Sequence, residues 1–225
     1  MSFISLKNVF KEYKISNESF KALNDISLNI ELGEFLMILG PSGCGKSTLL
    51  NIIGGMDKAT SGEVIINDND ISKYTDKLLT NYRRDNIGFV FQNYNLIANL
   101  TVLENVMLSN DRISEDDAIE CLKSLGIEDK RDQFPSALSG GEMQRVAIAR
   151  AIVKKPLILL CDEPTGALDS KNGYEVMEIL KKMNENGQTI IMVTHNLDYK
   201  KYATRVILLK DGMLNRGDDN EEPHE

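Results

Sequence analysis

The sequence predicts an α/β fold in which a parallel sheet carries a phosphate-binding loop at the carboxyl ends of its strands. Three observations support this prediction. A glycine-rich segment at 40–48 directly follows the apolar run 35–39 and precedes the helical pattern that begins at Leu49. Residues 157–161 are apolar enough for a central strand covered on both faces. Strand-like and helix-like segments then alternate up to a hairpin at 210–212.

The N-terminal part of the chain is mostly strand-like. Apolar and polar residues alternate over 1–14 and 21–29, which predicts an antiparallel hairpin with Asn17 and Ser19 in its loop. The segments that follow are expected to be strands at 35–39, 63–66 and 86–92 and a helix at 75–84.

Helical patterns dominate the middle of the chain. Helices are expected at 101–107, 114–125 and 139–154. Ser114 and Asp117 have capping-box spacing, and Pro156 ends the third helix. Residues 93–156 are therefore predicted to be a helical subdomain inserted between strands.

The sheet resumes at 157–161. A helix at 170–186, a strand at 188–193, a short helix and the final hairpin are expected to follow. We predict one domain over 1–225, with a core of about 1–92 and 157–215 and an acidic tail at 216–225.

Composition restricts the possible partners. The 225 residues include 26 Lys and Arg against 34 Asp and Glu, and the net charge of −8 argues against non-specific binding to nucleic acid or to an anionic bilayer. No signal segment is recognised and no apolar run approaches the ~18 residues that span a bilayer, so a cytoplasmic location is expected. Cys44, Cys121 and Cys161 lack disulfide or zinc spacing and are interpreted as free thiols. A helix N-terminus can lower the pKa of a thiol such as Cys44, but a passive loop residue is the expectation.

The segment 40–48 has the pattern G-x-x-x-x-G-K-[S/T]. Its glycines let consecutive N–H groups approach phosphate oxygens at a helix N-terminus, where the helix dipole favours anions. Lys46 is then placed to reach the β- and γ-phosphates and Ser47 to ligate Mg²⁺. The alternative, an ordinary glycine turn, does not explain the strand before the loop and the helix after it. The sequence therefore predicts binding of a nucleoside triphosphate.

Two strands end in chemically active residues at the same edge. Asp162 and Glu163 follow the strand 157–161, where one acid can hold Mg²⁺ and its neighbour can deprotonate attacking water. His195 follows the strand 188–193 and can donate to a γ-phosphate. The simpler interpretations are a turn-capping acid pair and a turn histidine.

A second anion site is predicted on the helical insert. Ser139, Gly140 and Gly141 begin a helix, far in sequence from the first loop. If two copies pair head to tail, these groups of one copy would close over the γ-phosphate held by the other.

Taken together, the motifs resemble those of the nucleotide-binding subunits of ATP-binding cassette (ABC) transporters over essentially the whole chain. Seven elements occur in the family's order: Tyr13, the loop 40–48, Gln92 in Phe91-Gln92-Asn93, the signature 138–144, the strand 157–163, the segment 166–169 and Thr194-His195. The resemblance implies a P-loop ATPase of the ABC type, with a mixed sheet core, an antiparallel β subdomain and the inserted helical subdomain.

The resemblance also implies roles for particular residues. Tyr13 would stack on adenine, and Gly40, Pro41, Ser42, Gly43, Cys44, Gly45, Lys46, Ser47 and Thr48 would cradle the phosphates. Gln92 would reach Mg²⁺ and the attacking water, and Asp162 would organise Mg²⁺. Glu163 would be the general base, His195 would brace the γ-phosphate, and Ser139, Gly140 and Gly141 would complete the partner's site. Asp169 would communicate across the dimer.

Three strings, 88–96, 101–106 and 162–170, resemble cassettes of macrolide-exporter, lipoprotein-release and antimicrobial-peptide-resistance systems. Such cassettes drive a separate membrane permease from the inner face of the membrane. A groove near 92–100, with Tyr94, Leu96 and Ile97, is a candidate permease contact, although these residues can equally be core. The chain departs from the commonest family letters at Glu142 and Asn196, and its insert is short between Val106 and Leu138.

Other functions remain open from the sequence. A P-loop small-molecule kinase would lack the signature and the His195 element. A DNA-repair ATPase head would need long insertions. A cassette that drives a cell-division-type membrane partner without transport would have the same ATPase elements.

Overall fold

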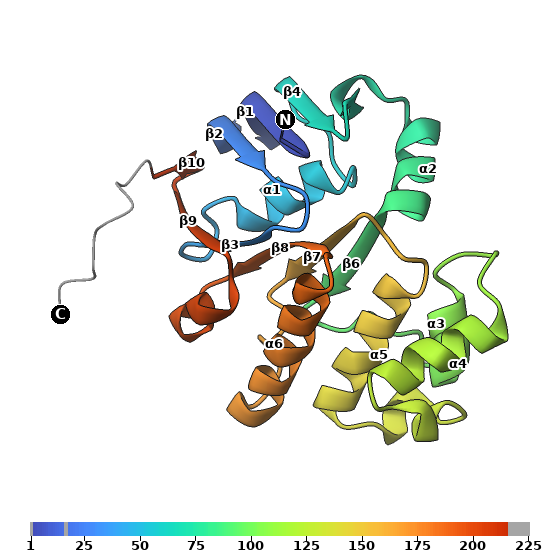
Figure 1. Ribbon diagram of the computed structural model, residues 1–225. Coiled ribbons are helices and arrows are strands. Elements are labelled where there is room, and N and C mark those ends of the chain that lie inside the picture. Colours follow the sequence, from blue (N-terminus) through green and yellow to red (C-terminus); the bar gives the residue numbers. More distant parts are fainter. Residues whose placement is uncertain (1, 16–17, 216–225) are drawn as a thin grey trace.

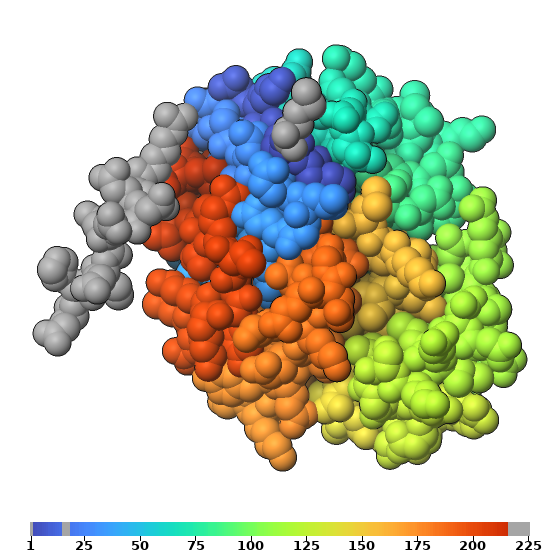
Figure 2. Space-filling model, viewed as in Figure 1, coloured from blue at the N-terminus to red at the C-terminus, as the bar shows by residue number. Residues whose placement is uncertain are grey.

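The computed structural model describes residues 2–15 and 18–215. Its chain forms two sheets and six α-helices within these ranges, with the antiparallel strands β1, β2 and β4 on one side and the helices α3, α4 and α5 on another (Figure 1). In the space-filling view, the segments coloured orange lie between the N-terminal strands and the helical segments, and those coloured red lie at the left (Figure 2). None of the helices in the described ranges is both long and apolar enough to cross a bilayer.

The smaller sheet is antiparallel, with the order β2-β1-β4-β5. The predicted hairpin is confirmed, although Ser19 was wrongly assigned to its loop: pairing continues further than expected, and Ser19 lies in β2 opposite Lys14. Asn17 lies outside the described residues. The strands are β1 (Ile4–Ile15), β2 (Glu18–Ile30), β4 (Ser61–Ile66) and β5 (Asn69–Asp70).

The larger sheet has the order β10-β9-β3-β8-β7-β6. All neighbouring strands in it are parallel except the pair β9 and β10. The carboxyl ends of β3, β6, β7 and β8 therefore meet at one edge. The strands are β3 (Phe35–Leu39), β6 (Ile87–Phe91), β7 (Ile158–Asp162), β8 (Thr189–Thr194), β9 (Arg205–Lys210) and β10 (Met213–Leu214).

Capping residues explain where several helices begin. The predicted capping box of Ser114 and Asp117 is present, and equivalent boxes join Thr101 to Glu104 and Ser139 to Glu142. The α-helices are α1 (Lys46–Ile53), α2 (Asp76–Asn86), α3 (Val102–Met107), α4 (Glu115–Ser124), α5 (Gly140–Ile152) and α6 (Ser170–Glu185). Short 3₁₀ helices are η1 (Ile71–Lys73), η2 (Glu128–Lys130), η3 (Pro135–Ala137) and η4 (Leu197–Tyr202).

The central strand β3 is buried on both faces, as its apolar run predicts. Phe35, Met37 and Leu39 pack into a core shared with α3 to α6, whereas Leu36 and Ile38 pack into a core shared with α1 and the antiparallel sheet. The helices between β6 and β7 agree with the predicted helical insert; the exact division into subdomains stays a prediction. The start of α5 contacts the loops that follow the carboxyl ends of β6 and β7, because Gly140 packs against Tyr94 and Leu168.

Candidate functional site

A cavity of about 730 Å³ opens at the carboxyl edge of the large sheet. It collects most of the side chains predicted to bind nucleotide or to catalyse. The residues that line it are Tyr13, Phe20, Ala22, Ser42, Gly43, Gly45, Lys46, Ser47, Thr48, Gln92, Asp162, Glu163 and His195.

The glycine-rich loop ends at Gly45, which caps α1 in the left-handed region with φ 107°. A Cβ at this position would lie 2.4 Å from the carbonyl oxygen of Ala22, so both the backbone angle and the space require glycine. Among the residues that the structure describes, no side chain caps the helix start. The first N–H groups of α1 therefore remain as donors at the positive end of a helix, which suits an anion.

Lys46 lies deep in this loop, with 7% of its surface exposed. Its Nζ donates to the carbonyl oxygens of Gly40 (2.7 Å) and Pro41 (2.8 Å). The ammonium group is thus held inside the phosphate loop by weak neutral acceptors. A triphosphate would offer charged acceptors, which form stronger hydrogen bonds with the same donor.

Ser47 and Asp162 join the loop to the end of β7. The Ser47 hydroxyl donates to Asp162 Oδ1 at 3.0 Å. Burial raises the pKa of Asp162, as does the charge of Glu163, against the opposing effects of Ser47 and Lys46. Hydroxyl, carboxylate and amide oxygens suit Mg²⁺. Within the described ranges no three His, Cys, Asp or Glu side chains form a metal cage.

Glu163 and His195 are brought together as the parallel strands predict. Glu163 Oε1 lies 3.0 Å from His195 Nδ1. Glu163 has a left-handed backbone (φ 47°), and its N–H donates to the carbonyl of Val193 at 3.0 Å. Among the described residues, its other oxygen, Oε2, is buried without a hydrogen-bond partner. A buried carboxylate oxygen without a donor is suited to accept a proton from bound water.

Gln92 also lines the cavity, at the end of β6. Its side chain packs against Gly166, where an added Cβ would lie 2.8 Å from Gln92 Nε2. The loop that contains Asp169 therefore lies beside Gln92. Asp169 itself caps α6 by accepting from the N–H of Asn172 at 2.9 Å.

Tyr13 and Phe20 face each other across β1 and β2 at the mouth of the cavity. The Tyr13 hydroxyl donates to Asp57 Oδ2 (2.7 Å), and Lys11 Nζ lies 2.6 Å from Asp57 Oδ1 and 4.7 Å from the centre of the Tyr13 ring. Burial opposes ionisation of Asp57, but the bonds from Lys11 and Tyr13 outweigh it and lower its pKa. Sequence analysis missed Asp57 because the turn after α1 gives no local sign of this contact.

The signature residues do not line the cavity of their own chain. Ser139 caps α5; its hydroxyl donates to Glu142 Oε2 (2.7 Å), and its N–H donates to the same oxygen (2.8 Å). Gly140 packs against Tyr94, and Gly141 packs against Asn172. Gly40, Pro41 and Cys44 support the loop without lining the cavity. Their predicted ligand contacts stay predictions.

The three cysteines are free thiols, as expected. Cys44 is buried, with 6% of its surface exposed. Burial raises the pKa of Cys121 to about 11 and also raises the pKa of Cys161. The described geometry gives the cysteines no catalytic contact.

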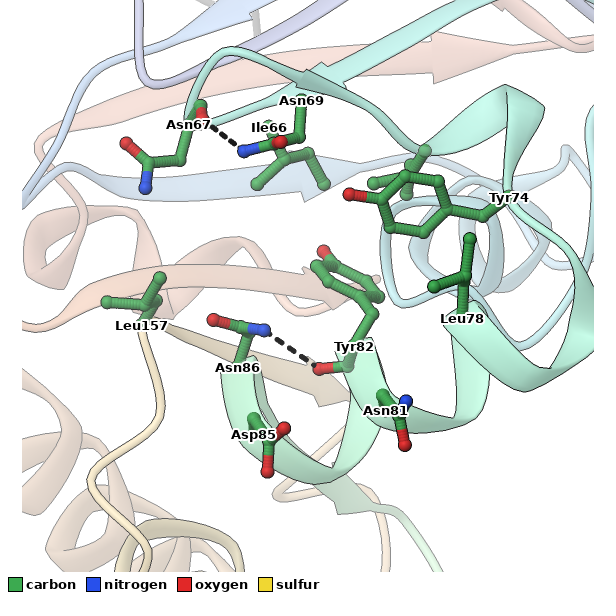
Figure 3. A pocket seen from close by; sticks show the side chains of 11 residues that line it. Ile66, Asn67, Asn69, Tyr74, Leu78, Asn81, Tyr82, Asp85, Asn86 and Leu157 are labelled. Carbon is green, nitrogen blue, oxygen red and sulfur yellow. Dashed lines mark hydrogen bonds between the residues drawn. The ribbon is translucent and has the colours of Figure 1, made fainter.

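A second cavity, of about 230 Å³, lies beside α2, and its lining differs chemically from that of the first cavity (Figure 3). Its lining includes Tyr74, Leu78, Tyr82, Asn86 and Leu157. Two of its polar groups already have partners: Asn86 Nδ2 donates to the carbonyl oxygen of Tyr82, and the Tyr82 hydroxyl donates to the carbonyl oxygen of Ile53. None of the described lining residues is lysine or arginine. This cavity therefore does not suit a phosphate.

The predicted permease groove is only partly present. Leu96 packs against the core, and Tyr94 is half-buried, whereas Ile97 is 48% exposed. Sequence analysis missed a neighbouring groove of about 290 Å³ between α2, β6 and α5. Its lining includes Met56, Phe89 and four cationic side chains: Arg83, Arg84, Arg150 and Lys154.

The chain is similar to several known proteins. A family model described as ABC transporter matches residues 23–166. The uncharacterized ABC transporter ATP-binding protein MJ0796 of Methanocaldococcus jannaschii is 50% identical over 224 residues, covering 95% of each chain. A solved dimeric structure of that cassette covers 95% of this chain and 97% of its own at a TM-score of 0.87, and a post-hydrolysis dimer with ADP and Pi matches at 0.87 and 49% identity. The macrolide export ATP-binding/permease protein MacB of Chlorobaculum tepidum is 43% identical over 216 residues, covering 94% of this chain and 33% of that protein.

Proposed function

Since the chain belongs to the ABC transporter family of ATP-binding cassettes, we propose that it hydrolyses ATP in a head-to-tail dimer and so drives a separate membrane permease. Two ATP molecules would lie between the two copies. The solved structures of the relative MJ0796 include a dimer and a post-hydrolysis state with ADP and Pi, which supports the same cycle here.

One observation carries the proposal: the cavity contains the phosphate loop and the catalytic side chains but lacks the signature. Ser139 lies at the start of α5, outside the cavity of its own chain. A second copy turned head to tail would supply this start as a lid. The lid would add N–H donors and the positive end of a helix to the γ-phosphate.

The residues of the cavity would divide the chemistry as follows. Lys46 would exchange the loop carbonyls for phosphate oxygens, and the Tyr13 ring would stack on adenine. Mg²⁺ bound with ATP would neutralise phosphate charge and would be held by Ser47, Asp162 and Gln92. Glu163 would accept the proton of the attacking water, and His195 would brace the γ-phosphate. Positioning and charge neutralisation would supply most of the rate enhancement.

The proposed permease would dock at the cationic groove beside Ile97. Arg83, Arg150 and Lys154 donate to backbone carbonyls, so their charges are not neutralised by those contacts. In a chain of net charge −8, such a groove suits an acidic segment of a partner. The relative MacB is an ATP-binding/permease protein, and this chain matches 33% of its length. The chain would then lie at the inner face of the membrane, and the cargo would be a peptide, lipoprotein or antibiotic.

Mixing two inactive variants tests the composite site. Ser139→Trp would disrupt the lid that a subunit contributes to its partner's site. Glu163→Gln would remove the base that it contributes to its own site. Each variant alone should lose activity. In a mixed dimer one site has both an intact base and an intact lid. About half the dimers would be mixed, so about a quarter of the parental phosphate release is expected.

Absence of recovery on mixing, with dimers present, would contradict the shared site. A parental rate per subunit at dilutions where only monomers exist would do the same. Free phosphate as product, without a phosphorylated acceptor, separates the ATPase from a kinase.

A further inference from the structure

One arginine clamps the turn after β6 to helix α5. Arg150, in the last turn of α5, donates from Nη1 to the carbonyl oxygen of Asn95 (2.6 Å) and from Nη2 to that of Tyr94 (2.8 Å). The two nitrogens of one guanidinium thus hold two successive carbonyls. Lysine, with a single ammonium group, cannot reproduce this fork.

The clamped turn has an unusual backbone. Tyr94 (φ 58°) and Asn95 (φ 51°) both lie in the left-handed region. Asparagine tolerates this region, but tyrosine rarely adopts it. Such conformations persist where the surrounding structure holds them. Arg150 provides that hold across 55 and 56 positions of sequence.

The same turn is packed against two other loops of the site. The Tyr94 hydroxyl lies 3.4 Å from the carbonyl oxygen of Ala167. A Cβ on Gly140 would lie 2.9 Å from that hydroxyl, and the side chain of Gln92 packs on Gly166. The turn 92–95, the start of α5 and the loop 166–169 therefore form one packed cluster, which we call the loop cluster.

We propose that Arg150 is a positioning residue for Gln92: its fork fixes the turn 92–95 on α5, so that Gln92 and the Ser139 end of α5 move as one unit. This inference rests on the proposed function, in which Gln92 serves the cavity of its own chain and Ser139 closes the partner's. Arg150 does not line the nucleotide cavity. Its loss should therefore slow turnover without weakening ATP binding.

A kinetic cycle over two positions tests this role. ATPase rates are measured for the parental chain, Arg150→Lys, Gln92→Ala and the double variant. We expect Arg150→Lys to lower kcat about tenfold and to change KM for ATP by no more than about twofold. The double variant should be no slower than Gln92→Ala, because Arg150 acts only through the position of Gln92. The matched control is Arg131→Lys, an arginine of the same subdomain that is paired with exposed Asp132; it should keep the parental rate.

Hydrogen exchange at the amides of Tyr94 and Ile97 gives a readout that does not depend on catalysis. Arg150→Lys should accelerate exchange there, with the exchange of β7 and α1 unchanged. Multiplicative losses in the double variant, or a rise in KM equal to the fall in kcat, would overturn the positioning role. If Arg150→Lys does not fold, Tyr94→Ala replaces it in the same cycle. Tyr94→Ala removes the side chain that contacts Ala167 and Gly140 in the loop cluster.

The two levels of inference fail differently. A parental chain without ATPase activity would refute the proposed function. If Gln92→Ala keeps the parental rate, Gln92 has no catalytic role, and the exchange comparison alone decides whether Arg150 holds the turn. Unchanged exchange at Tyr94 and Ile97 would refute the clamp even in an active enzyme.

Discussion

Glu163 and His195 are each the first residue after one of two neighbouring parallel strands, and 3.0 Å separates Glu163 Oε1 from His195 Nδ1. The side chain of Glu163 is only 16% exposed, whereas that of His195 is 70% exposed. The carboxylate is therefore fixed at the cavity wall, while the imidazole extends toward the space that the phosphates would occupy.

Replacing Glu163 with glutamine should separate binding from turnover. The amide keeps the shape of the side chain but is a far weaker base, so kcat should fall about 10²–10⁴-fold. ATP affinity should stay parental, and ATP should trap a dimer visible by size-exclusion chromatography. Glu185→Gln, which alters an exposed acid at the end of α6, is the control. A Glu163→Gln protein that hydrolyses ATP at the parental rate would rule out this base.

Glu142 should weaken closure of the dimer. The carboxylate of Glu142 accepts from both the N–H and the hydroxyl of Ser139, and these bonds lower the pKa of Glu142. Glu142 therefore carries a negative charge where the proposed lid meets the partner's γ-phosphate. Glu142→Gln removes that repulsion. In the Glu163→Gln background we expect ATP-driven dimerisation to tighten about three- to tenfold, more at low salt.

Sedimentation at two salt concentrations measures this effect. Asp129→Asn is the matched control, because Asp129 also lies beside Lys130 but does not touch Ser139. Equal or weaker dimerisation in Glu142→Gln would show that the carboxylate does not oppose closure.

The sequence predicts features that depend on local patterns. The spacing of Ser114 and Asp117 predicts the start of a helix, and the apolar run before Gly40 predicts β3. The order of strands in the large sheet was not predicted, since β3 pairs with β8 and β9 from the other end of the chain. Contacts such as Arg150 to Tyr94 were missed for the same reason: residues far apart in sequence that meet only in the fold leave no periodic pattern.

Likewise, Lys46, Asp162, Glu163 and His195 could be predicted because they stand in the glycine-rich loop or at the end of a recognisable strand, whereas Phe20 and Ala22, inside β2, also line the cavity and were not predicted. The role of Asp57 could not be predicted, because its hydrogen-bond partner Tyr13 is 44 positions away in the sequence.

Asp57 should make stability depend on pH. Its pKa lies below the ordinary value of 3.8 in the folded chain. A lowered carboxyl pKa contributes stability that is present above the unfolded-state pKa and is lost as pH falls through the folded pKa. Asp57→Asn should therefore lower the free energy of unfolding by about 1–2 kcal/mol at pH 7. The difference in this free energy between the variant and the parental chain should become smaller below about pH 4.

Urea midpoints between pH 7 and pH 3.5 check this dependence. Glu12→Gln removes one negative charge at the position next to Tyr13 and is the control for the change in net charge. A gap for Asp57→Asn that stays constant over this range would exclude the ionic contact.

Asn105 should be among the costliest polar residues to remove. It is fully buried on α3; its amide donates to the carbonyls of Ile97, Leu100 and Thr101, and its Oδ1 accepts from the N–H of Ile97. Asn105→Ala would leave buried backbone groups without partners and should lower the free energy of unfolding by about 2–4 kcal/mol. Asn81→Ala, on the half-buried face of α2, should change it by less than about 0.5 kcal/mol. Denaturant unfolding compares the two.

Ile97 should matter only when the permease is present. Asn105 fixes the backbone of Ile97, and the Ile97 side chain is 48% exposed. Ile97 follows Asn95 by two positions, and Arg150 of the cationic groove donates to the Asn95 carbonyl. Ile97→Glu should spare the ATPase activity of the isolated subunit, because the side chain does not line the nucleotide cavity. In the reconstituted complex it should abolish the coupling of ATP hydrolysis to permease movement, because a charge replaces apolar contact area. Leu78→Glu, with 47% exposure on α2, makes the same chemical change elsewhere and should leave coupling intact. If both variants couple normally, the permease does not dock at Ile97; if both fail, the loss reflects added charge and not a specific contact.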